Sequence, residues 1–413
     1  MDMQIRLRYK IVKSHNLKFR DQKMSKIIIL ITLLMLNLSV LFAMETEPNE
    51  ENSQKKHIVV KNPMVAGASN FILDQIRSAT SDFVRKHGLT EGDTIIINTA
   101  HKEELLSAAT DSALPLLIQS SGGAVSNTLS CLARLGIHPR AIGSAVFDAF
   151  GFAYLADLTK KGVEYRLTET IEPSQGSGAC YIFITEAEYV GADGSVSKKI
   201  ERTMGTYIGD AGSMRVYQDD IDWVSEADMF IAEGYLFCET ARDAMFELAA
   251  GAKAKGKLVT LSIAAGFCAT TYKESLNRFI DEQADIVIGD KFEALMLTNR
   301  TDMRDAIAVW QAMGKKGAIT CGAEGAYVFD DTKIYYIAPP SVGIVVDATG
   351  AGDGFVAGFV AEILKTGDIV NAGKLGAYCA GSVLQVAGGY PPESLTDDVA
   401  LGLPWLISHR KIN

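Results

Sequence analysis

The chain has 413 residues, of which 48% are hydrophobic and 22% are charged, a balance that is typical of folded globular proteins and excludes a largely disordered chain. The formal net charge is −10, yet residues 1–43 carry eight Lys or Arg against two Asp or Glu, so the rest of the chain is strongly acidic. An acidic body offers no general positive field for the phosphates of a nucleic acid. We therefore expect a small-molecule partner and no nucleic-acid partner.

The chain begins with a basic and then apolar segment. Two lysines precede the apolar run Ile27–Ala43, an order that is typical of a signal peptide, and Ala43 is a candidate cleavage position. The run is also near the lower length limit of a membrane span. Met44 opens a polar, acidic stretch and is an alternative translation start. We therefore assign residues 1–58 to a signal-like segment and a polar linker, which carry no information about the fold.

Short Val- and Ile-rich runs alternate with helical patterns over residues 59–400. The apolar runs are residues 63–68, 141–147, 228–236, 257–263, 284–290 and 317–322. Helix-like patterns separate them, such as the Leu- and Ala-rich stretch that follows Ser126. Because parallel sheets covered by helices on both faces show this rhythm, we predict a doubly wound α/β domain over residues 59–400.

The texture of the sequence changes between Gly162 and Gly205, where β-rich segments are broken by Gly and Asp turns. These segments are residues 163–171, 178–188 and 198–207, and residues 93–99 have the same character. Alternating apolar and polar residues indicate half-buried strands. We predict a small antiparallel β lid, mainly from residues 162–205, and we expect residues 401–413 to form a C-terminal tail.

A glycine-rich turn lies between a strand-like run, Gly343–Val346, and a helical pattern that includes Phe355 and Phe359. A helix N-terminus offers free backbone N–H groups and the positive end of the helix dipole, and glycine lets a phosphate approach the backbone closely. The turn is therefore a candidate anion site. Asp353 lies in the first turn of this helix, where it is either a capping residue or a carboxylate beside the anion. The glycine spacing matches neither a Walker loop nor a dinucleotide-binding fingerprint.

Three motifs resemble signatures of the ribokinase or PfkB family, and most closely its adenosine-kinase-like branch. Asp347–Asp353 (DATGAGD) resembles the family's Asp-Thr-x-Gly-Ala-Gly-Asp, and Ser121–Asn127 (SGGAVSN) resembles its Gly-Gly-x-x-x-Asn. Asn70–Asp74 resembles the Asn-x-x-x-Asp of the family's first strand, so the resemblance covers about residues 60–395. It implies a ribokinase-like fold and the ATP- and Mg²⁺-dependent phosphorylation of a hydroxymethyl group on a sugar or nucleoside.

By this resemblance Asp353 matches the catalytic base, which takes the proton from the substrate hydroxyl as it attacks the γ-phosphate. The backbone anion hole would consist of Gly350, Ala351 and Gly352. Positioning and charge stabilisation are what phosphoryl transfer mainly requires from a protein. Asp347 and Thr349 match a site for a monovalent cation such as K⁺, although Ala348 departs from the usual Thr.

The resemblance also assigns substrate and metal contacts. The positions that hold sugar hydroxyls are Asp74, Gly122, Gly123 and Asn127. Asn127 could equally cap the helix that follows it, and Tyr235 either stacks on a purine or packs in the core. Asp290 and Glu293 match the family's Asn-x-x-Glu, which supports Mg²⁺; Asp replaces Asn here and remains an oxygen ligand. The alternative for this pair is an ordinary helix start.

The nucleotide contacts are expected from the lid and from a strand end. Arg202 resembles an arginine that faces the phosphates in adenosine-kinase-like proteins, and its alternative is a surface arginine of the lid. The adenine pocket would be walled by Thr320, Gly322 and Gly325. These three residues could also be routine packing of a strand and its turn.

Features outside the signatures favour adenosine as the acceptor, with ADP and AMP as products. They are residues 201–204, residues 232–236 and residues 89–106. Two alternatives stay open, a free-sugar kinase of the ribokinase or fructokinase kind and a catalytically silent ligand-binding protein. We expect a monomer or a homodimer formed through the lid. Because ATP is scarce outside the cytoplasm, we expect a cytoplasmic protein, the alternative being export or anchoring through Ile27–Ala43.

Overall fold

A computed structural model describes residues 60–171, 174–190 and 196–412. The signal-like segment Ile27–Ala43 and the alternative start Met44 lie outside these residues. Within the described ranges, no helix has the length and apolar character needed to cross a membrane. Everything described belongs to one compact unit that runs from His57 to Asn413.

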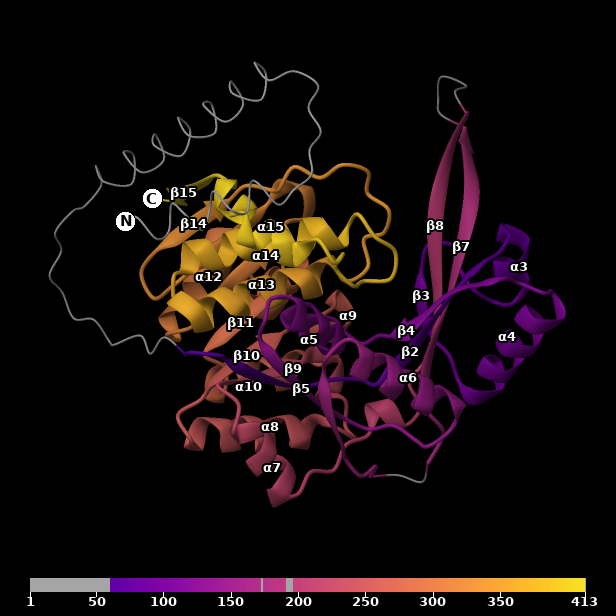
Figure 1. Cartoon of the computed structure of the whole chain (residues 1–413), viewed down its shortest axis with the longest axis horizontal. Coiled ribbons are helices and arrows are strands. Elements are labelled where there is room, and N and C mark those ends of the chain that lie inside the picture. The colour runs from indigo at the N-terminus through magenta and orange to yellow at the C-terminus, as the bar shows by residue number, and fades with distance from the viewer. Residues whose placement is uncertain (1–59, 172–173, 191–195, 413) are drawn as a thin grey trace, which may run out of the picture. The chain divides into compact units, whose positions relative to one another are not determined.

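The larger of two sheets has ten strands in the order β15-β14-β13-β12-β11-β10-β9-β1-β5-β6. Figure 1 labels β15, β14, β11, β10, β9 and β5 of this sheet. Seven of them, from β6 to β12 across the sheet, run parallel, and β13, β14 and β15 are added antiparallel at one edge. The strands are β1 (Met64–Ala68), β5 (His138–Gly143), β6 (Glu164–Leu167), β9 (Met229–Glu233), β10 (Leu258–Ser262), β11 (Ile286–Asp290), β12 (Lys316–Thr320), β13 (Ala326–Phe329), β14 (Ile334–Ile337) and β15 (His409–Ile412).

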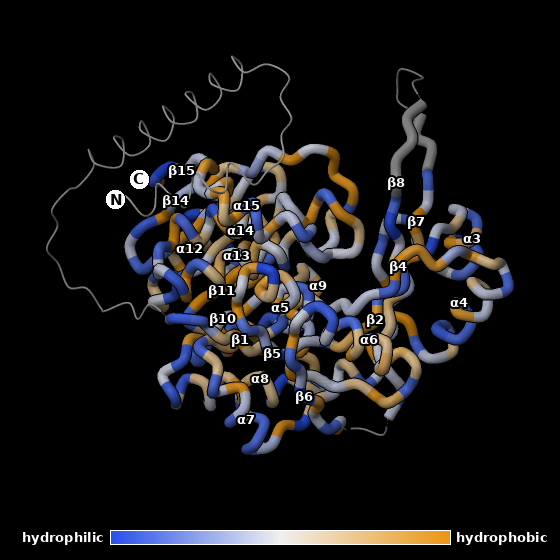
Figure 2. Tube along the Cα trace, viewed as in Figure 1, coloured by the Kyte–Doolittle hydropathy of each residue, from blue (hydrophilic) through white to orange (hydrophobic). Residues whose placement is uncertain are grey.

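Helices cover both faces of this sheet. Alternate residues of each central strand enter two separate cores: Val65 packs with α5, α6, α13 and α14, whereas Ala66 packs with α7 to α12. Figure 2 shows the hydrophobic character of the central strands β10 and β11. The helices are α3 (Ser81–Lys86), α4 (Thr99–Asp111), α5 (Ala124–Arg134), α6 (Ala149–Lys160), α7 (Gln218–Ser225), α8 (Arg242–Ala254), α9 (Gly266–Thr271), α10 (Lys273–Glu282), α11 (Lys291–Thr298), α12 (Met303–Ala312), α13 (Ala351–Thr366), α14 (Ile369–Val383) and α15 (Leu395–Ala400). The predicted doubly wound α/β domain is confirmed.

The second sheet is the lid, with the strand order β3-β8-β7-β2-β4. Its strands are β2 (Ile72–Ser78), β3 (Thr94–Ile96), β4 (Leu116–Ser121), β7 (Gly178–Val190) and β8 (Val196–Tyr207). The sheet is mixed, because β2 runs parallel to β7 and β3 runs parallel to β8. Helices α3 and α4 cover one face through a core that includes Phe83, Leu105 and Phe183. The oligomeric state stays a prediction.

Three boundaries differ from the expectation. Residues 164–167 form β6 at the edge of the main sheet rather than in the lid, because Glu164 pairs with Arg140 of β5, backbone to backbone and side chain to side chain. Residues 343–346 form no strand: β12 is already paired with β13, which leaves no place beside it, and Val346 is held by the carbonyl of Leu384 instead. The expected C-terminal tail adds strand β15 to the sheet.

Candidate active site

The side chains singled out from the sequence gather at one edge of the main sheet. Asn70 follows β1, Tyr235 follows β9, Asp290 ends β11 and Thr320 ends β12. These strands are parallel neighbours or near neighbours, so their carboxyl ends lie at the same edge, where open α/β sheets bind ligands. The lid sheet contributes Asp74 from β2 and Arg202 from β8.

The glycine-rich turn forms the N-terminus of α13, with Gly350 as its N-cap residue in a left-handed conformation at φ 74°. A Cβ at Gly350 would lie 2.6 Å from the Cα of Gly389, so only glycine fits there. No side chain caps this helix, and a Cβ at Gly352 would meet nothing within 4 Å. The Ala351 amide makes a long contact of 3.4 Å with the carbonyl of Ala348. The helix N-terminus is therefore left without a side-chain cap, which is the arrangement that commonly binds anions.

Asp353 is the third residue of α13 and points at the N-terminal part of α5. The Nδ2 of Asn127 donates to its Oδ2 at 2.9 Å, and the Thr128 hydroxyl donates to its carbonyl oxygen at 3.2 Å. Desolvation raises the pKa of Asp353 to about 7, although the Asn127 hydrogen bond opposes this shift. Nearby negative charges raise the pKa further, and they belong to Glu233, Asp74 and Glu293. Neither Asp353 nor Asn127 is an N-cap, since those positions are Gly350 and Gly123.

The N-terminus of α5 is closed from inside the protein. The Oε2 of Glu233 accepts from the Val125 amide at 2.9 Å and from the Ser69 hydroxyl at 2.8 Å, and Ser69 Oγ accepts from the Ser126 amide at 3.1 Å. Glu233 is fully buried, and its Oε1 has no partner among the described residues. Desolvation raises the pKa of Glu233 to about 7. The sequence did not predict a role for Glu233, although a carboxylate at the end of an apolar strand was the available signal.

Asp74 lies in lid strand β2, beside the turn that opens α5. A Cβ at Gly122 would lie 2.5 Å from the Asp74 carboxylate, so glycine lets the turn approach this carboxylate. Desolvation raises the pKa of Asp74 to about 7, and the cations of Arg202 and Lys161 oppose the shift. Lys161 also donates to the carbonyl of Ser121 at 3.2 Å, which fixes the approach to the turn. The predicted acceptor residues Asp74, Gly122, Gly123 and Asn127 are thus brought together.

Arg202 of lid strand β8 reaches across to the glycine-rich turn, where its Nη1 forms an ion pair with the Oδ2 of Asp347. The same oxygen accepts from the amide of Gly388 at 3.0 Å, and Asp347 Oδ1 accepts from the amide of Thr349 at 2.9 Å. The side chain of Asp347 is 6% exposed. Both of its oxygens therefore have partners within the protein, and the monovalent-cation site at Asp347 and Thr349 stays a prediction.

Gly388 and Gly389 were missed as part of this site. Gly389 packs on Gly350, and a Cβ at Gly389 would lie 3.5 Å from the Nδ2 of Asn127. Both glycines have positive φ angles, 96° and 69°. The signal in the sequence was a Gly-Gly pair followed closely by two prolines, which is typical of a turn.

Asp290 and Glu293 are joined in a capping box at the start of α11. The Glu293 amide donates to Asp290 Oδ1 at 2.8 Å, and the Asp290 amide donates to Glu293 Oε2 at 2.7 Å. Desolvation and the neighbouring Asp290 charge raise the pKa of Glu293 to about 7. Among the described residues there is no group of three or more His, Cys, Asp or Glu that could hold a metal ion. A metal at this pair would therefore need ligands from the substrate or from water.

The three residues expected beside adenine lie at the end of β12 and in the turn that follows it. A Cβ at Gly325 would lie 2.3 Å from the carbonyl oxygen of Ile337, so this glycine is required for packing. A Cβ at Gly322 would meet nothing within 4 Å, so that position faces open space. Thr320 is half-buried. Of the three, Gly322 has the surroundings that a ligand could approach.

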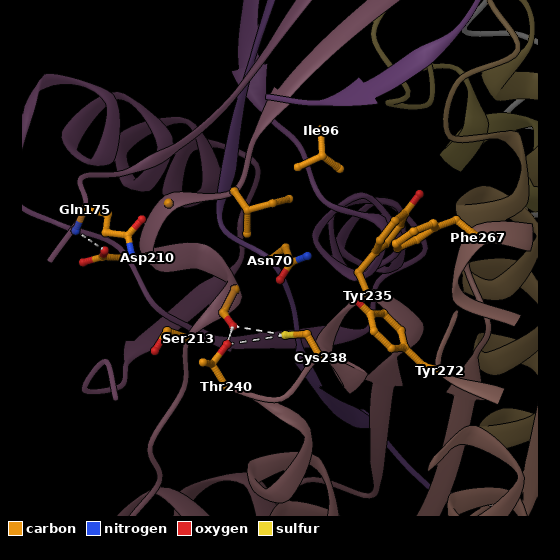
Figure 3. A pocket seen from close by; sticks show the side chains of 13 residues that line it. Asn70, Ile96, Gln175, Asp210, Ser213, Tyr235, Cys238, Thr240, Phe267 and Tyr272 are labelled. Atoms are coloured by element: carbon orange, nitrogen blue, oxygen red, sulfur yellow. Dashed lines mark hydrogen bonds between the residues drawn. The ribbon is translucent and has the colours of Figure 1, made fainter. Parts of the chain in front are cut away.

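A cavity of about 510 Å³ lies between lid and main sheet, and Asn70 and Tyr235 are among the residues that line it. Figure 3 shows aromatic side chains at one end, namely Tyr235, Phe267 and Tyr272, and polar side chains at the other, namely Gln175, Asp210 and Ser213. The ring centroids of Phe267 and Tyr272 are 5.7 Å apart in an edge-to-face arrangement. A cavity of this size holds a small molecule, and its aromatic end offers surfaces on which a planar ring can stack.

Comparison with known proteins gives one family and several relatives. The family described as pfkB family carbohydrate kinase matches residues 92–395. Adenosine kinase of Saccharomyces cerevisiae is 26% identical over 352 residues, which cover 79% of this chain and 96% of the yeast protein. A probable sugar kinase from Rhizobium etli has a TM-score of 0.71 at 27% identity, covering 84% of this chain and 100% of that one. Adenosine kinase from Sinorhizobium meliloti has a TM-score of 0.70 at 27% identity, covering 83% and 100%.

Proposed function

The chain belongs to the pfkB family of carbohydrate kinases, and from this premise we propose that it transfers the γ-phosphoryl group of ATP to the 5′-hydroxyl of adenosine, with Asp353 as the catalytic base. Membership makes the chain a carbohydrate or nucleoside kinase, and it implies ATP as donor and usually Mg²⁺. The choice of adenosine and the roles of individual residues are our proposal. The surroundings of the Asp353 carboxylate are the observation that carries it.

Asp353 has the properties that a general base requires. A base works best when its pKa lies near the operating pH, and desolvation raises the pKa of Asp353 to about 7. The amide of Asn127 holds one carboxylate oxygen at 2.9 Å, which leaves the other oxygen for the hydroxyl of the acceptor. We propose that Asp353 takes the proton of that hydroxyl while its oxygen attacks the γ-phosphorus.

The N-terminus of α13 would stabilise the phosphoryl group during transfer. The backbone at Gly350, Ala351 and Gly352 provides donors that no side chain caps, and Gly352 leaves space for phosphate oxygens. Fixed donors aimed at developing charge are commonly the largest single contribution to catalysis. Because the donors and Asp353 belong to the same helical turn, the acceptor hydroxyl and the phosphoryl group would meet beside that turn.

The acceptor would span the region between lid and main sheet. Asp74, Gly123 and Asn127 would hold the ribose hydroxyls, since carboxylate and amide side chains pair with vicinal hydroxyls. The aromatic end of the 510 Å³ cavity would receive the purine, with Tyr235 and Phe267 as stacking surfaces. Two relatives with adenosine kinase in their names support this acceptor.

The residues present fit Mg²⁺ held through water rather than directly. Asp290 and Glu293 each use one oxygen in the capping box, so each retains a second oxygen for a metal-bound water. Mg²⁺ usually keeps several waters and is bound through few carboxylates together with substrate phosphates. When bound, Mg²⁺ would neutralise charge on those phosphates. The open side of Gly322, with Thr320 nearby, would lie against the nucleotide base of ATP.

A panel of acceptors with Mg·ATP tests this function. We expect kcat/KM for adenosine to exceed that for ribose and fructose, because stacking of a base contributes about 1–3 kcal/mol. Efficient phosphorylation of a free sugar with adenosine inert would establish the free-sugar kinase instead. Binding of a nucleoside without any turnover would establish the silent ligand-binding protein.

A matched pair of variants separates stacking from packing at Tyr235. If the ring stacks on the purine, Tyr235→Leu raises KM for adenosine roughly tenfold or more and leaves a free pentose unaffected. The control is Tyr336→Leu, because Tyr336 is a half-buried tyrosine in β14, remote in the sheet from β9. Equal losses for adenosine and pentose would show that Tyr235 only packs.

A further inference from the structure

The carboxylate of Asp347 is a buried negative charge whose compensation comes from another element. Its two oxygens accept from the amides of Thr349 and Gly388 and from the guanidinium of Arg202, and the side chain is 6% exposed. An ionised carboxylate at such a place requires a positive partner, because an unpaired buried charge is strongly unfavourable. Arg202 supplies that charge.

A monovalent cation and Arg202 would compete for the same oxygen. The resemblance places a K⁺-like ion at Asp347, yet the Oδ2 of Asp347 already takes a guanidinium and an amide. A second cation there would be repelled by a guanidinium that stays protonated at every pH of interest. The residues present therefore do not fit a bound monovalent cation.

The positive charge of Arg202 also acts on Asp74, the carboxylate proposed to hold the acceptor. Besides its ion pair with Asp347, its positive charge is the foremost influence that opposes the upward shift of the Asp74 pKa. Its Nε and Nη2 are buried and have no hydrogen-bond partner in the part of the chain that the structure describes. A guanidinium has five N–H donors, and the ion pair with Asp347 uses only the Nη1 end of it.

We infer that the guanidinium of Arg202 takes the place of the monovalent cation at Asp347, so that the chain needs no K⁺ to assemble the α13 N-terminus. This inference rests on the proposed kinase function of the site. The cation is carried on lid strand β8, so the charge that steadies the glycine-rich turn arrives with the lid rather than from solution. Arg202 acts on the turn through Asp347 and is a positioning residue.

The test compares salts at equal ionic strength: potassium chloride, sodium chloride and tetramethylammonium chloride, whose cation is too large for the site. Turnover with Mg·ATP and the best acceptor, and the unfolding temperature, are measured for wild type and Arg202→Met. We expect wild type to vary less than about twofold in turnover among the three salts and to show no K⁺-specific shift in unfolding temperature. We expect Arg202→Met to lose about 10²-fold in tetramethylammonium and to regain roughly tenfold in potassium, with a K⁺-specific rise in unfolding temperature.

Two controls make the outcome decisive. Arg202→Met combined with Asp347→Asn removes both charges and is expected to lose the K⁺ response, whereas Arg202→Lys keeps a fixed cation and is expected to show none. A wild type that needs K⁺ for turnover or is stabilised by it specifically overturns the inference, even if every variant fails to fold. If no acceptor is phosphorylated, the proposed function fails, but the unfolding temperatures still report on Arg202.

Discussion

Two helices begin at glycine-rich turns and meet at the site, yet their N-termini differ. The N-terminus of α5 is satisfied internally, because Glu233 and Ser69 accept from its first amides. The N-terminus of α13 has no side-chain cap, and Gly352 faces open space. A helix N-terminus whose amides are hydrogen-bonded within the protein serves packing, whereas an uncapped N-terminus is available to a ligand. The same sequence texture therefore has two different consequences.

The largest expected effect comes from removing the carboxylate at the open terminus. Asp353→Asn keeps the size of the side chain and an oxygen that can accept from Asn127, so folding and ATP binding are retained. Turnover is expected to fall at least about 10²-fold, the usual range for a positioned base. The control is Asp219→Asn, an exposed aspartate in the first turn of α7. Near-native turnover in Asp353→Asn would remove the residue from the catalytic role.

The next largest effect is expected in the pH dependence of turnover, which reports the ionisation of Asp353 at the N-terminus of α13. The base acts only when it is ionised, and the pKa of Asp353 is raised to about 7. Turnover is therefore expected to rise with pH through about 7 and to fall roughly tenfold per unit below it. A rate that is flat down to about pH 5, near the range of ordinary carboxylates, would contradict this.

The stability of the fold is expected to fall as the pH rises, whereas turnover rises. Because the pKa of Asp353 is raised above its value of 3.8, the folded state favours the protonated form, and that stabilising contribution is lost as the pH rises through about 7. At about pH 8, Asp353→Asn is therefore expected to unfold at a higher temperature than wild type, with a difference in unfolding free energy on the order of a few kcal/mol. At about pH 3 the two proteins are expected to unfold at the same temperature. Thermal unfolding at both pH values measures this.

Two alanine substitutions compare the N-terminus of α5, which is hydrogen-bonded within the protein, with the uncapped N-terminus of α13. At Gly123, φ is 92° and a Cβ would lie 2.2 Å from the carbonyl oxygen of Asn70, so Gly123→Ala is expected to cost about 2–3 kcal/mol of unfolding free energy. At Gly352 a Cβ meets nothing within 4 Å, so Gly352→Ala should stay within about 0.5 kcal/mol of wild type. Its turnover is nevertheless expected to fall about tenfold, because the methyl group would obstruct the phosphoryl group. Urea unfolding and initial rates give both quantities; full activity in Gly352→Ala would argue that no anion approaches there.

The smallest effect is a shift of the pH profile. The negative charge of Glu233 raises the pKa of Asp353, so Glu233→Gln is expected to move the rise of turnover to lower pH. The Oε1 of glutamine can still accept from the Val125 amide and the Ser69 hydroxyl, so the hydrogen bonds at the N-terminus of α5 are preserved. A pH–rate profile for this variant beside wild type measures the shift. An unchanged midpoint would show that the two carboxyls do not interact.

The sequence predicted those features that depend on residues close together in the chain. The alternation of strands and helices gave the doubly wound fold, and the glycine spacings located both helix termini. Glu233 could not be assigned, because its partners Ser69 and Val125 lie 164 and 108 residues away. The ion pair of Arg202 with Asp347 joins residues 145 apart, so only the folded arrangement shows that these two side chains meet.

The errors have the same origin. Residues 344–346 are β-branched and favour a strand locally, but the sheet offers them no partner, and Ile344 remains 83% exposed. Residues 163–171 resemble the lid strands in texture, and the choice of sheet for β6 depended on its register with β5. Pairing between strands is decided by tertiary context, which local pattern does not contain.

The assembly of the lid from distant segments affects how the chain folds during synthesis. Strand β2, which carries Asp74, pairs with β7 in the register Asp74 to Cys180. At about 5–20 residues per second, the ribosome needs roughly 5–20 s to make the intervening hundred or so residues. Throughout that interval the apolar side chains of β2, Ile72 and Ile76, lack the neighbour that buries them. The nascent chain is therefore expected to depend on chaperones until residue 184 has emerged, and a fragment that ends before β7 is expected to aggregate.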